Sequence, residues 1–425
     1  MRVVCKVDEE AFAIGNSTDF NINNQKQFTY TFWKKVKDIP NFYMEEGIDL
    51  LYISMFVFGA DRLLNRKLAA DSWSREIELF IPVLSYDKFI SIQNDLERML
   101  NFLSGDSWKL SFRKRGLTQK EKQVKAKMEK NQRDKRNYNT ISMFSGGLDS
   151  FIGSIDLLQT QKVPLFVSHY GGGKGTREYQ DILKTKLNQE YNIDEDNFMQ
   201  FYAAVKEGDE DTTRTRSFMF FSHAIALATT MNQEVTLVIP ENGLISLNIP
   251  LTYSRVGTSS TRTTHPFYME QLQNILTKLD IKVKICNPYQ FCTKGEMILQ
   301  CKNKEFLYDN IKNTMSCSHP DNGRYIKQTE AAHCGYCLPC TIRLAAIKKS
   351  GITDSSYYYD KKYSKGKKAM EDFNTYKLAI EKFDPKYAFL KIQCSGPISE
   401  SIKEYSDLYI RGMKELADYL GEYHV

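Results

Sequence analysis

Residues 142–158 read SMFSGGLDSFIGSIDLL, and the expected fold follows from this stretch. Ahead of the two glycines the chain is apolar and partly β-branched, which predicts a short buried strand. After them, apolar residues from Phe151 to Leu158 recur at helical spacing. The glycine turn therefore joins a strand to the first turn of a helix, where free backbone N–H groups can hold an anion.

Downstream of the turn, strand patterns alternate with helical patterns. The apolar strand patterns cover 163–173, 197–205, 234–243 and 281–288. The helical patterns cover 178–191, 217–231, 266–279 and 293–303. This order predicts an α/β fold in which helices cover both faces of a parallel sheet. Ligands of such sheets bind beyond the carboxyl ends of the strands, and the glycine turn follows the first strand.

The chain divides into four parts. Helix, strand, helix and strand patterns in residues 1–115 predict a small α+β domain, which is a candidate docking site for a protein partner. A basic linker at 116–137, a main domain at 138–348 and a helical extension at 349–425 follow. Because the glycine turn belongs to the main domain, we expect deletion of residues 1–115 to spare ligand binding there. The extension either packs on the sheet or forms a homodimer contact.

The formal net charge is +6. Residues 116–138 hold eight Lys or Arg against three Asp or Glu, which accounts for +5 of that charge. A solvated helical linker is the favoured interpretation of such a run, and an RNA-binding arm is the less favoured one. No apolar run is long enough to span a membrane, and the first residues lack the pattern of a signal peptide. These features predict a cytoplasmic protein that binds neither membrane nor nucleic acid.

The glycine turn lacks the Lys-Ser/Thr pair of a Walker A loop and the third glycine of a dinucleotide fingerprint. A strand, SGGLDS and a helix in this order resemble the PP-loop of ATP pyrophosphatases, which have an adenine nucleotide alpha hydrolase-like fold. The resemblance implies that ATP is cut between its α and β phosphates and that AMP is placed on a carboxyl or amide oxygen. In this role the glycines let the backbone close around pyrophosphate, while Asp149 either caps the helix or holds Mg²⁺.

The predicted ATP-binding residues are Phe144, Ser145, Gly146, Gly147, Leu148, Asp149, Ser150 and His169. His169 ends the second strand of the sheet and would border the adenine, and a packed position at the core edge is the equal alternative. For the loop itself, the alternative is a plain turn in which Asp149 and Ser150 only cap the helix.

Four of the nine cysteines cluster in a CxxCxxC run with one upstream partner. Four thiolates at this spacing suit a tetrahedral Zn²⁺ with no open position, which indicates a structural metal site. An iron–sulfur cluster uses the same ligand type and is the main alternative, and buried free thiols are another. Ligation by the flanking His319 or His333 is less favoured than a surface or supporting position. The predicted metal ligands are Cys317, Cys334, Cys337 and Cys340.

The PP-loop, the cysteine spacing and Arg343 together resemble 7-cyano-7-deazaguanine synthase, the QueC family, over about residues 138–348. Thr293 and Lys294 match a Thr-Lys segment before a helix of that family, and Arg216 matches an arginine that opens its middle helix. The resemblance implies ATP, Mg²⁺ and Zn²⁺ as cofactors and a deazaguanine-type small molecule as substrate.

The chain also departs from that family. Ser217 stands where the family has Asn, the run SHYGGGKG replaces a Tyr-Gly-Gln run, and residues 240–266 replace the family's base-binding segment. Chains with an added N-terminal domain resemble the QueC-like proteins of antiphage gene clusters, of the QatC type or the type IV CBASS type. In that branch the resemblance implies that a deazaguanine is joined to an amine of a protein partner from the same defence gene cluster.

The mechanism implied by the resemblance begins when the carboxylate of 7-carboxy-7-deazaguanine attacks the α-phosphorus of ATP, after which an amine displaces AMP. Asp149, Lys294 and Arg216 are the predicted catalytic residues, and the two cations would neutralise charge on the phosphates. The predicted substrate-binding residues are Glu241, Asn242, Arg262, Thr263, Thr264 and His265. A plain loop or capping role is the equal alternative for each of them.

Three other functions stay open at this point. They are a nitrile synthase that uses ammonia, a PP-loop sulfur transferase that acts on tRNA, and a non-catalytic adaptor. The sulfur transferase would need a catalytic thiol near the loop, for which Cys286 or Cys292 would have to serve. The intact SGGLDS argues against the adaptor.

Overall fold

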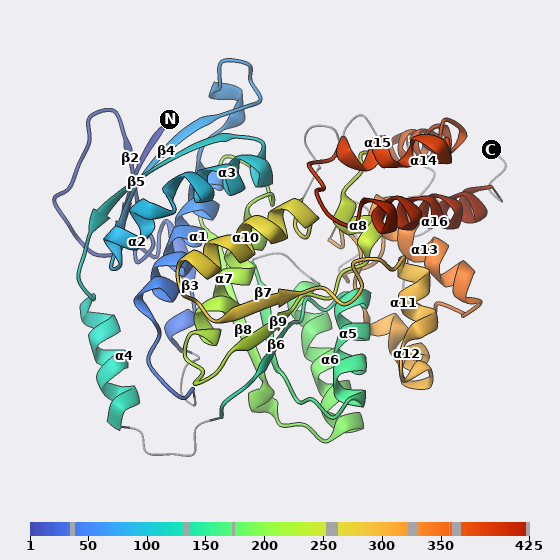
Figure 1. Ribbon diagram of the computed structural model, residues 1–425, viewed down its shortest axis with the longest axis horizontal. Helices are drawn as coiled ribbons and strands as arrows, with labels where there is room; N and C mark the ends of the chain where they lie inside the picture. The colour runs from blue at the N-terminus through green and yellow to red at the C-terminus, as the bar shows by residue number, and fades with distance from the viewer. Residues whose placement is uncertain are drawn as a thin grey trace.

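The computed structural model describes residues 1–34, 39–130, 136–171, 175–251, 262–321, 330–356, 358 and 367–421. Its larger sheet has six strands in the order β10-β9-β6-β7-β8-β3 (Figure 1). These strands are β3 (Phe28–Tyr30), β6 (Thr140–Met143), β7 (Leu165–Tyr170), β8 (Phe198–Val205), β9 (Val235–Val238) and β10 (Val283–Cys286). All neighbours pair in parallel except β3, which pairs antiparallel with β8.

The order of the five parallel strands places β6 in the centre, with β7 and β8 on one side and β9 and β10 on the other. The chain therefore reverses its direction of winding between β6 and β9, which makes their carboxyl ends the topological switch point of a doubly wound sheet. The parallel α/β sheet predicted from the sequence is confirmed. The glycine turn follows β6 and lies at the switch point.

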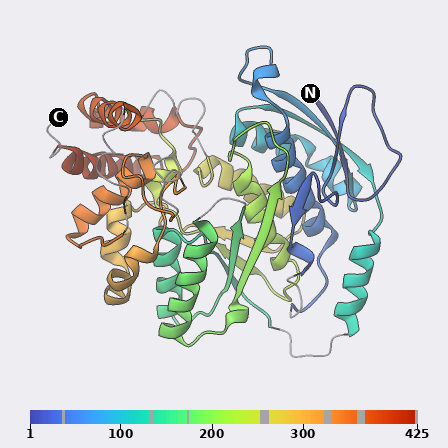
Figure 2. The same cartoon turned by 180° about the vertical axis from the view of Figure 1, so that it is seen from behind.

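Helices cover both faces of this sheet. The covering helices include α5 (Leu148–Gln159), α6 (Thr176–Tyr191), α7 (Arg216–Ala228) and α10 (Pro266–Lys278). The main domain also contains α8 (Gly243–Leu247), α11 (Lys294–Gln300) and α12 (Lys304–Asn310). Successive side chains of β7 point to opposite faces, so Leu165 and Val167 join the core of α7 while Phe166 joins the core of α5 and α6. Figure 2 shows α5 and α6, both green, side by side on one face.

The N-terminal region forms a second, four-stranded sheet in the order β2-β1-β4-β5. Its elements are β1 (Arg2–Lys6), β2 (Thr18–Asn21), α1 (Glu45–Leu63), β4 (Glu76–Val83), α2 (Tyr86–Ser91), α3 (Gln93–Ser104) and β5 (Ser107–Lys114). Every neighbouring pair is parallel, and α2 and α3 cross over between β4 and β5. This parallel arrangement differs from the predicted α+β domain, because the sequence pattern did not show the short strands β1 and β2.

The N-terminal region shares its core with the larger sheet. Residues 47–61 of α1 are all buried, and a Cβ on Gly47 would lie 2.7 Å from the side chain of Thr229, just after α7. The ring centres of Phe32 and Phe201 of β8 lie 5.4 Å apart, and one hydrophobic cluster contains side chains of both sheets. Because these contacts join the two regions into one core, they oppose the expectation that deletion of residues 1–115 spares ligand binding in the main domain.

The remaining helices lie in the basic linker, at the end of the main domain and in the C-terminal extension. They are α4 (Gln119–Lys130), α13 (Leu338–Ser350), α14 (Lys367–Glu381), α15 (Ala388–Gln393) and α16 (Ile402–Leu420). The extension packs on the main domain, where α16 shares a hydrophobic cluster with α8 and α13 (Figure 1). Among the described helices, none combines the length and the apolar character that crossing a membrane requires.

Candidate active site

The carboxyl ends of the parallel strands open into a cavity of about 450 Å³. Its walls come from the PP-loop after β6, the ends of β7 and β9, the starts of α7 and α11, and residues 315–318. The predicted residues that line it are Ser145, Gly147, Leu148, Asp149, Ser150, His169, Arg216, Glu241, Thr263, Thr264, Lys294 and Cys317. The cavity thus lies where the strand order predicts a ligand.

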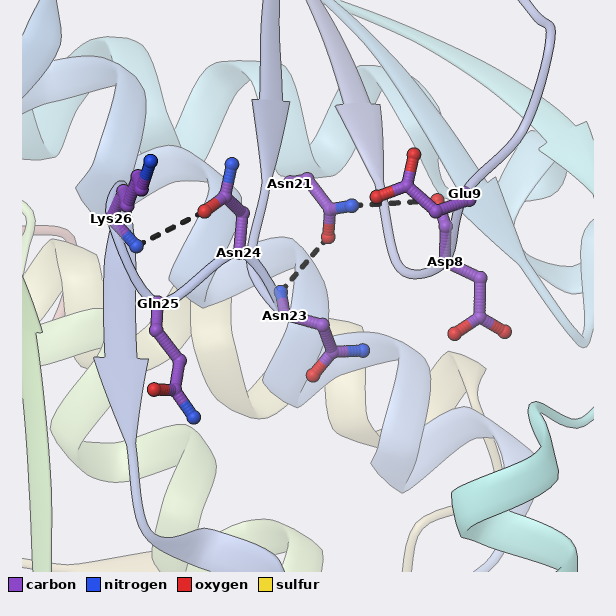
Figure 3. A pocket seen from close by; sticks show the side chains of 7 residues that line it. All are labelled: Asp8, Glu9, Asn21, Asn23, Asn24, Gln25 and Lys26. Atoms are coloured by element: carbon purple, nitrogen blue, oxygen red, sulfur yellow. Dashed lines mark hydrogen bonds between the residues drawn. The ribbon is translucent and has the colours of Figure 1, made fainter.

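A second hollow, of about 430 Å³, lies beside β2 of the N-terminal sheet (Figure 3). Its polar groups bond to the turn that carries them. Asn21 Oδ1 accepts from the N–H of Asn23 at 2.9 Å, and Asn24 Oδ1 accepts from the N–H of Lys26 at 3.0 Å. These side chains stabilise turns, as Asn commonly does, so we place the chemistry in the first cavity.

The PP-loop depends on a backbone conformation that favours glycine. Gly146 has φ of +83°, and a Cβ there would lie 3.2 Å from the backbone N of Gln180. Gln180, on α6, donates from Nε2 to the carbonyl oxygens of Ser145 at 3.2 Å and His169 at 3.1 Å. The sequence did not single out Gln180, because its contact with the loop exists only in the folded chain.

The start of α5 offers donors to an anion. Its N-cap residue is Gly147, which has no side chain to cap the helix, so in the described structure the first N–H groups face the cavity wall without a cap from that residue. The Oγ atoms of Ser145 and Ser150 lie 3.1 Å apart beside them. Phe144 differs from its predicted role: its ring is buried 5.7 Å from Phe166 and 5.6 Å from Phe198, so it belongs to the core beneath the loop.

Asp149 connects three elements at the cavity wall. Its Oδ1 accepts from Lys294 Nζ at 2.5 Å, and its Oδ2 accepts from Asn242 Nδ2 at 2.7 Å. Burial would raise the pKa of Asp149, but the charge of Lys294 and the surrounding hydrogen bonds outweigh burial and lower that pKa to about 2. Asp149 is therefore an anion paired with a buried cation. Burial, followed by the charge of Asp149, raises the pKa of Glu241 and favours its neutral form.

Arg216 contributes the other positive charge. Surrounding protein lowers its pKa, yet its side chain stays exposed to solvent through the cavity. Within the described part of the chain, no carboxylate pairs with it. His169 is neutral at pH 7, since burial, His223 and Arg216 lower its pKa to about 3. Among the described residues that line the cavity, Arg216 is therefore a cation without a carboxylate partner, which suits an anionic ligand.

Three of the six predicted substrate-binding residues, Glu241, Thr263 and Thr264, line the cavity. Thr264 Oγ1 lies 2.9 Å from Ser246 Oγ. Asn242 lies behind the wall, where it caps α8 by accepting from the Ile245 N–H. Residues 252–261, within the segment that replaces the family's base-binding segment, lie outside the described residues.

Arg262 and His265 also point away from the cavity. The Arg262 guanidinium lies 4.4 Å from the ring centre of Phe102 and donates to the Phe102 carbonyl. His265 Nδ1 accepts from the Phe267 N–H at the start of α10, and its Nε2 lies 3.2 Å from Ser395 Oγ. Because these bonds use both ring nitrogens, the described geometry favours the capping alternative for His265.

The four predicted cysteine ligands lie together, with all four Sγ atoms within 4.8 Å of one another. Cys317 Sγ is 4.0 Å from Cys337 Sγ, and Cys334 Sγ is 4.0 Å from Cys340 Sγ. A tetrahedral Zn²⁺ with Zn–S bonds of about 2.3 Å needs sulfur atoms about 3.8 Å apart, so these thiols could hold zinc. His333 Nδ1 lies 3.7 Å from Cys340 Sγ, as a neighbour of the set.

The cysteine cluster adjoins the PP-loop. Met315 donates its N–H to the Gly146 carbonyl at 2.9 Å, and Cys317 lines the cavity two residues later. Arg343, fully buried, donates to Thr314 Oγ1 at 2.7 Å and so fixes the same segment. Met315, Ser316 and Ser318 also line the cavity and carry no motif of their own, although their place beside the metal ligand Cys317 was a usable signal.

The comparisons with known proteins agree with this arrangement. No family model matches the chain. The chain is similar to the 7-cyano-7-deazaguanine synthase of Rickettsia bellii (strain OSU 85-389), with 26% identity over 242 residues, or 51% of this chain and 97% of that protein. It is 26% identical to the enzyme of the same name from Rickettsia akari over 245 residues, covering 51% of this chain and 98% of that protein.

The corresponding protein of Sulfurovum sp. is 24% identical over 241 residues, again 51% of this chain, and 97% of that protein. These distant relatives support a QueC-like family. The parallel α/β sheet and the four-cysteine cluster are consistent with it. About half of this chain lies outside each alignment, since each covers 51%.

Proposed function

We propose that this chain uses ATP to adenylate the carboxylate of a 7-deazaguanine acid and then joins the acyl group to an amine of a partner protein. The observation that supports this proposal is the content of one cavity, which holds the PP-loop, the Lys294–Asp149 pair and the uncompensated Arg216. The deazaguanine part of the proposal comes from the names of the relatives.

The donors and cations of the cavity would each bind a different part of the ATP phosphates. Pyrophosphate would lie in the PP-loop, where the N–H groups of α5 and the hydroxyls of Ser145 and Ser150 donate to it. Arg216 would stabilise the charge that develops at the α-phosphorus, because no carboxylate among the described residues pairs with it. Lys294 would act beside the loop, held in place by Asp149.

The far wall would receive the acid and the amine. Glu241, Thr263 and Thr264 present a neutral carboxyl and two hydroxyls, groups that hydrogen-bond to a heterocyclic base without adding charge. His169, neutral and at the end of β7, would border the adenine. The Asn242 side chain would act through Asp149, to which it donates at 2.7 Å.

The residues of the site fit one of the two expected metal ions better than the other. Zn²⁺ would be held by the four cysteines and would order the wall around Cys317, and a closed set of four thiolates leaves no position for catalysis. Mg²⁺ fits less well. Asp149, the ionised carboxylate of the lining, already uses both oxygens for Lys294 and Asn242. We therefore assign Mg²⁺ no step.

The choice of a protein amine rests on the departures from the QueC family. Residues 240–266 and the run SHYGGGKG differ in sequence from the corresponding segments of that family, and this chain has an additional N-terminal region. We propose the antiphage branch, of the QatC type or the type IV CBASS type, with a cytoplasmic partner from the same gene cluster and a monomer or homodimer as the working unit. Intact-mass spectrometry tests this: the partner should gain one deazaguanine acyl group after incubation with this chain, ATP and the acid. A partner of unchanged mass, beside consumed ATP, would contradict it.

The second candidate is a 7-cyano-7-deazaguanine synthase that uses ammonia, and the printed names of the relatives favour it. It predicts two AMP per acid, because the amide oxygen needs its own activation. The tRNA sulfur transferase finds less support. Neither Cys286 nor Cys292 is among the residues that line the described cavity, and burial, followed by Glu296, raises the pKa of Cys292.

A further inference from the structure

The C-terminal helix α16 lies outside residues 138–348, which carry the family motifs, yet it reaches the start of α11 (Figure 1). Glu415 of α16 makes the contact. Its Oε2 accepts from Thr293 Oγ1 at 2.7 Å, and its Oε1 accepts from the backbone N–H of Gly295 at 3.1 Å. The Glu415 side chain is only 3% exposed, so these bonds are shielded from water.

The two residues that Glu415 binds stand on either side of Lys294. Lys294 is the first residue of α11, and its Nζ reaches Asp149 Oδ1 in the cavity wall. The fit is tight, because a Cβ on Gly295 would lie 2.8 Å from Glu415 Oε2. A carboxylate at this place also complements the positive end of the helix dipole and satisfies an N–H that the helix leaves unpaired.

A second residue of α16 holds the same helix start. Thr293 and Glu296 form a capping box, each side chain accepting from the backbone N–H of the other. Arg411, one turn before Glu415, pairs with Glu296 Oε1 at 2.7 Å. A helix of seven residues is marginal by itself, so α11 depends on such contacts for its position.

We propose that Glu415 is a positioning residue for Lys294, and that α16 is thereby part of the ATP site; this inference rests on the proposed function. Lys294 carries its charge on a flexible four-carbon stem, so the place of its ammonium depends on the backbone that presents it. Glu415 fixes that backbone from outside, while Asp149 fixes the ammonium from inside the cavity.

The test is a double-mutant cycle read out as the dissociation constant of ATP with Mg²⁺, measured by calorimetry on the full chain. Glu415→Ala should weaken ATP binding about tenfold, which corresponds to about 1.4 kcal/mol. Glu415→Gln should weaken it less, since the amide oxygen still accepts from the Gly295 N–H. In a Lys294→Met background, Glu415→Ala should have no further effect, because the two residues act through one group.

Met413→Ala is the matched control. Met413 lies two residues away on α16, is 1% exposed, and packs in the C-terminal core without touching α11 in any described contact. It should lower the melting temperature and leave the affinity for ATP unchanged. The inference is overturned if Met413→Ala weakens ATP as much as Glu415→Ala, if a folded Glu415→Ala binds ATP normally, or if the two substitutions of the cycle add.

Failure of the proposed function looks different. A wild-type chain that binds ATP but releases no pyrophosphate when 7-carboxy-7-deazaguanine is added contradicts the proposed reaction, and the binding cycle still decides the role of Glu415. A wild-type chain that binds no ATP overturns both.

Discussion

Asp149 gathers groups that lie far apart in the sequence. Lys294 is 145 positions away and Asn242 is 93 positions away, and both bond to the same carboxylate. Lys294 is 5% exposed, so this is a buried ion pair rather than a surface one. Such pairs are costly to break from one side, because the remaining charge stays buried without a partner.

The pair predicts a pH-dependent instability in Lys294→Met. Without the lysine, only hydrogen bonds such as that from Asn242 oppose burial, and we expect burial to raise the folded-state pKa of Asp149 above its unfolded value of about 3.9. A raised pKa means that stability is lost as pH rises through it. The loss in free energy of unfolding relative to wild type should therefore be larger at pH 8 than at pH 5, by about 3 kcal/mol. Denaturant unfolding at the two pH values measures this.

Lys294→Met/Asp149→Asn is the control for that experiment. It removes the buried charge, so the added pH dependence should disappear. In the wild type the pKa of Asp149 is held at about 2, so the stability that Asp149 contributes is present above pH 4 and is lost only as pH falls toward 2. A Lys294→Met deficit that is equal at pH 5 and pH 8 would contradict the account of this pair.

Some residues of the site could be predicted from the sequence, and others could not. Ser145 and Ser150 were predicted because their pattern is local, six residues between a strand and a helix. Gln180 and Glu415 were missed because they reach the site only through folding, across helices with no motif of their own. Arg262 and His265 were misleading, since polar residues that follow a strand also cap helices and cover aromatic rings.

The PP-loop element predicts a sharp difference between two glycines. Gly146→Ala places a side chain at φ of +83° and 3.2 Å from the backbone N of Gln180, so the loop must move and ATP affinity should fall at least tenfold. Gly116→Ala is the matched control, since nothing lies within 4 Å of its added Cβ. Calorimetry with ATP measures both. Equal affinities would show that the loop does not bind ATP in this conformation.

The cysteine cluster predicts a bound metal whose loss weakens ATP binding. Elemental analysis should find about one zinc per chain and no iron. Cys337→Ser should lose the metal, lower the melting temperature, and also weaken ATP binding several-fold, because Met315 bonds to the Gly146 carbonyl from the same segment. Iron with acid-labile sulfide would contradict the zinc assignment, and normal ATP binding in the metal-free variant would contradict the coupling.

The N-terminal region and the main domain share one hydrophobic core, although the sequence suggested a domain boundary between them. The basic linker marks a change in composition, and this favoured a boundary near residue 115. Strand β3, however, extends the larger sheet, and α1 is buried against α7. The parallel sheet could be predicted because it repeats a local alternation of strand and helix. The pairing of β3 with β8 could not, since Thr29 and Ala204 come together with no signal in either segment.

This shared core predicts the outcome of a truncation. Residues 116–425 alone should be insoluble or unfolded, because removing β3 and α1 exposes the buried face of α7 to water. Soluble yield and far-UV circular dichroism measure this. Co-expression of residues 1–115 with residues 116–425 should restore a soluble complex. A stable 116–425 fragment that binds ATP would contradict the single core.

The central claim, that a carboxylate attacks the α-phosphorus of ATP in this cavity, is tested most directly with isotopes. The acid is supplied with ¹⁸O in both carboxyl oxygens, together with the partner amine, and the AMP is analysed by mass spectrometry. The account predicts one AMP per acid consumed, each with one ¹⁸O, and an amide that keeps the other. Two labelled AMP per acid would indicate the nitrile synthase, and AMP without ¹⁸O would contradict adenylation of the carboxylate.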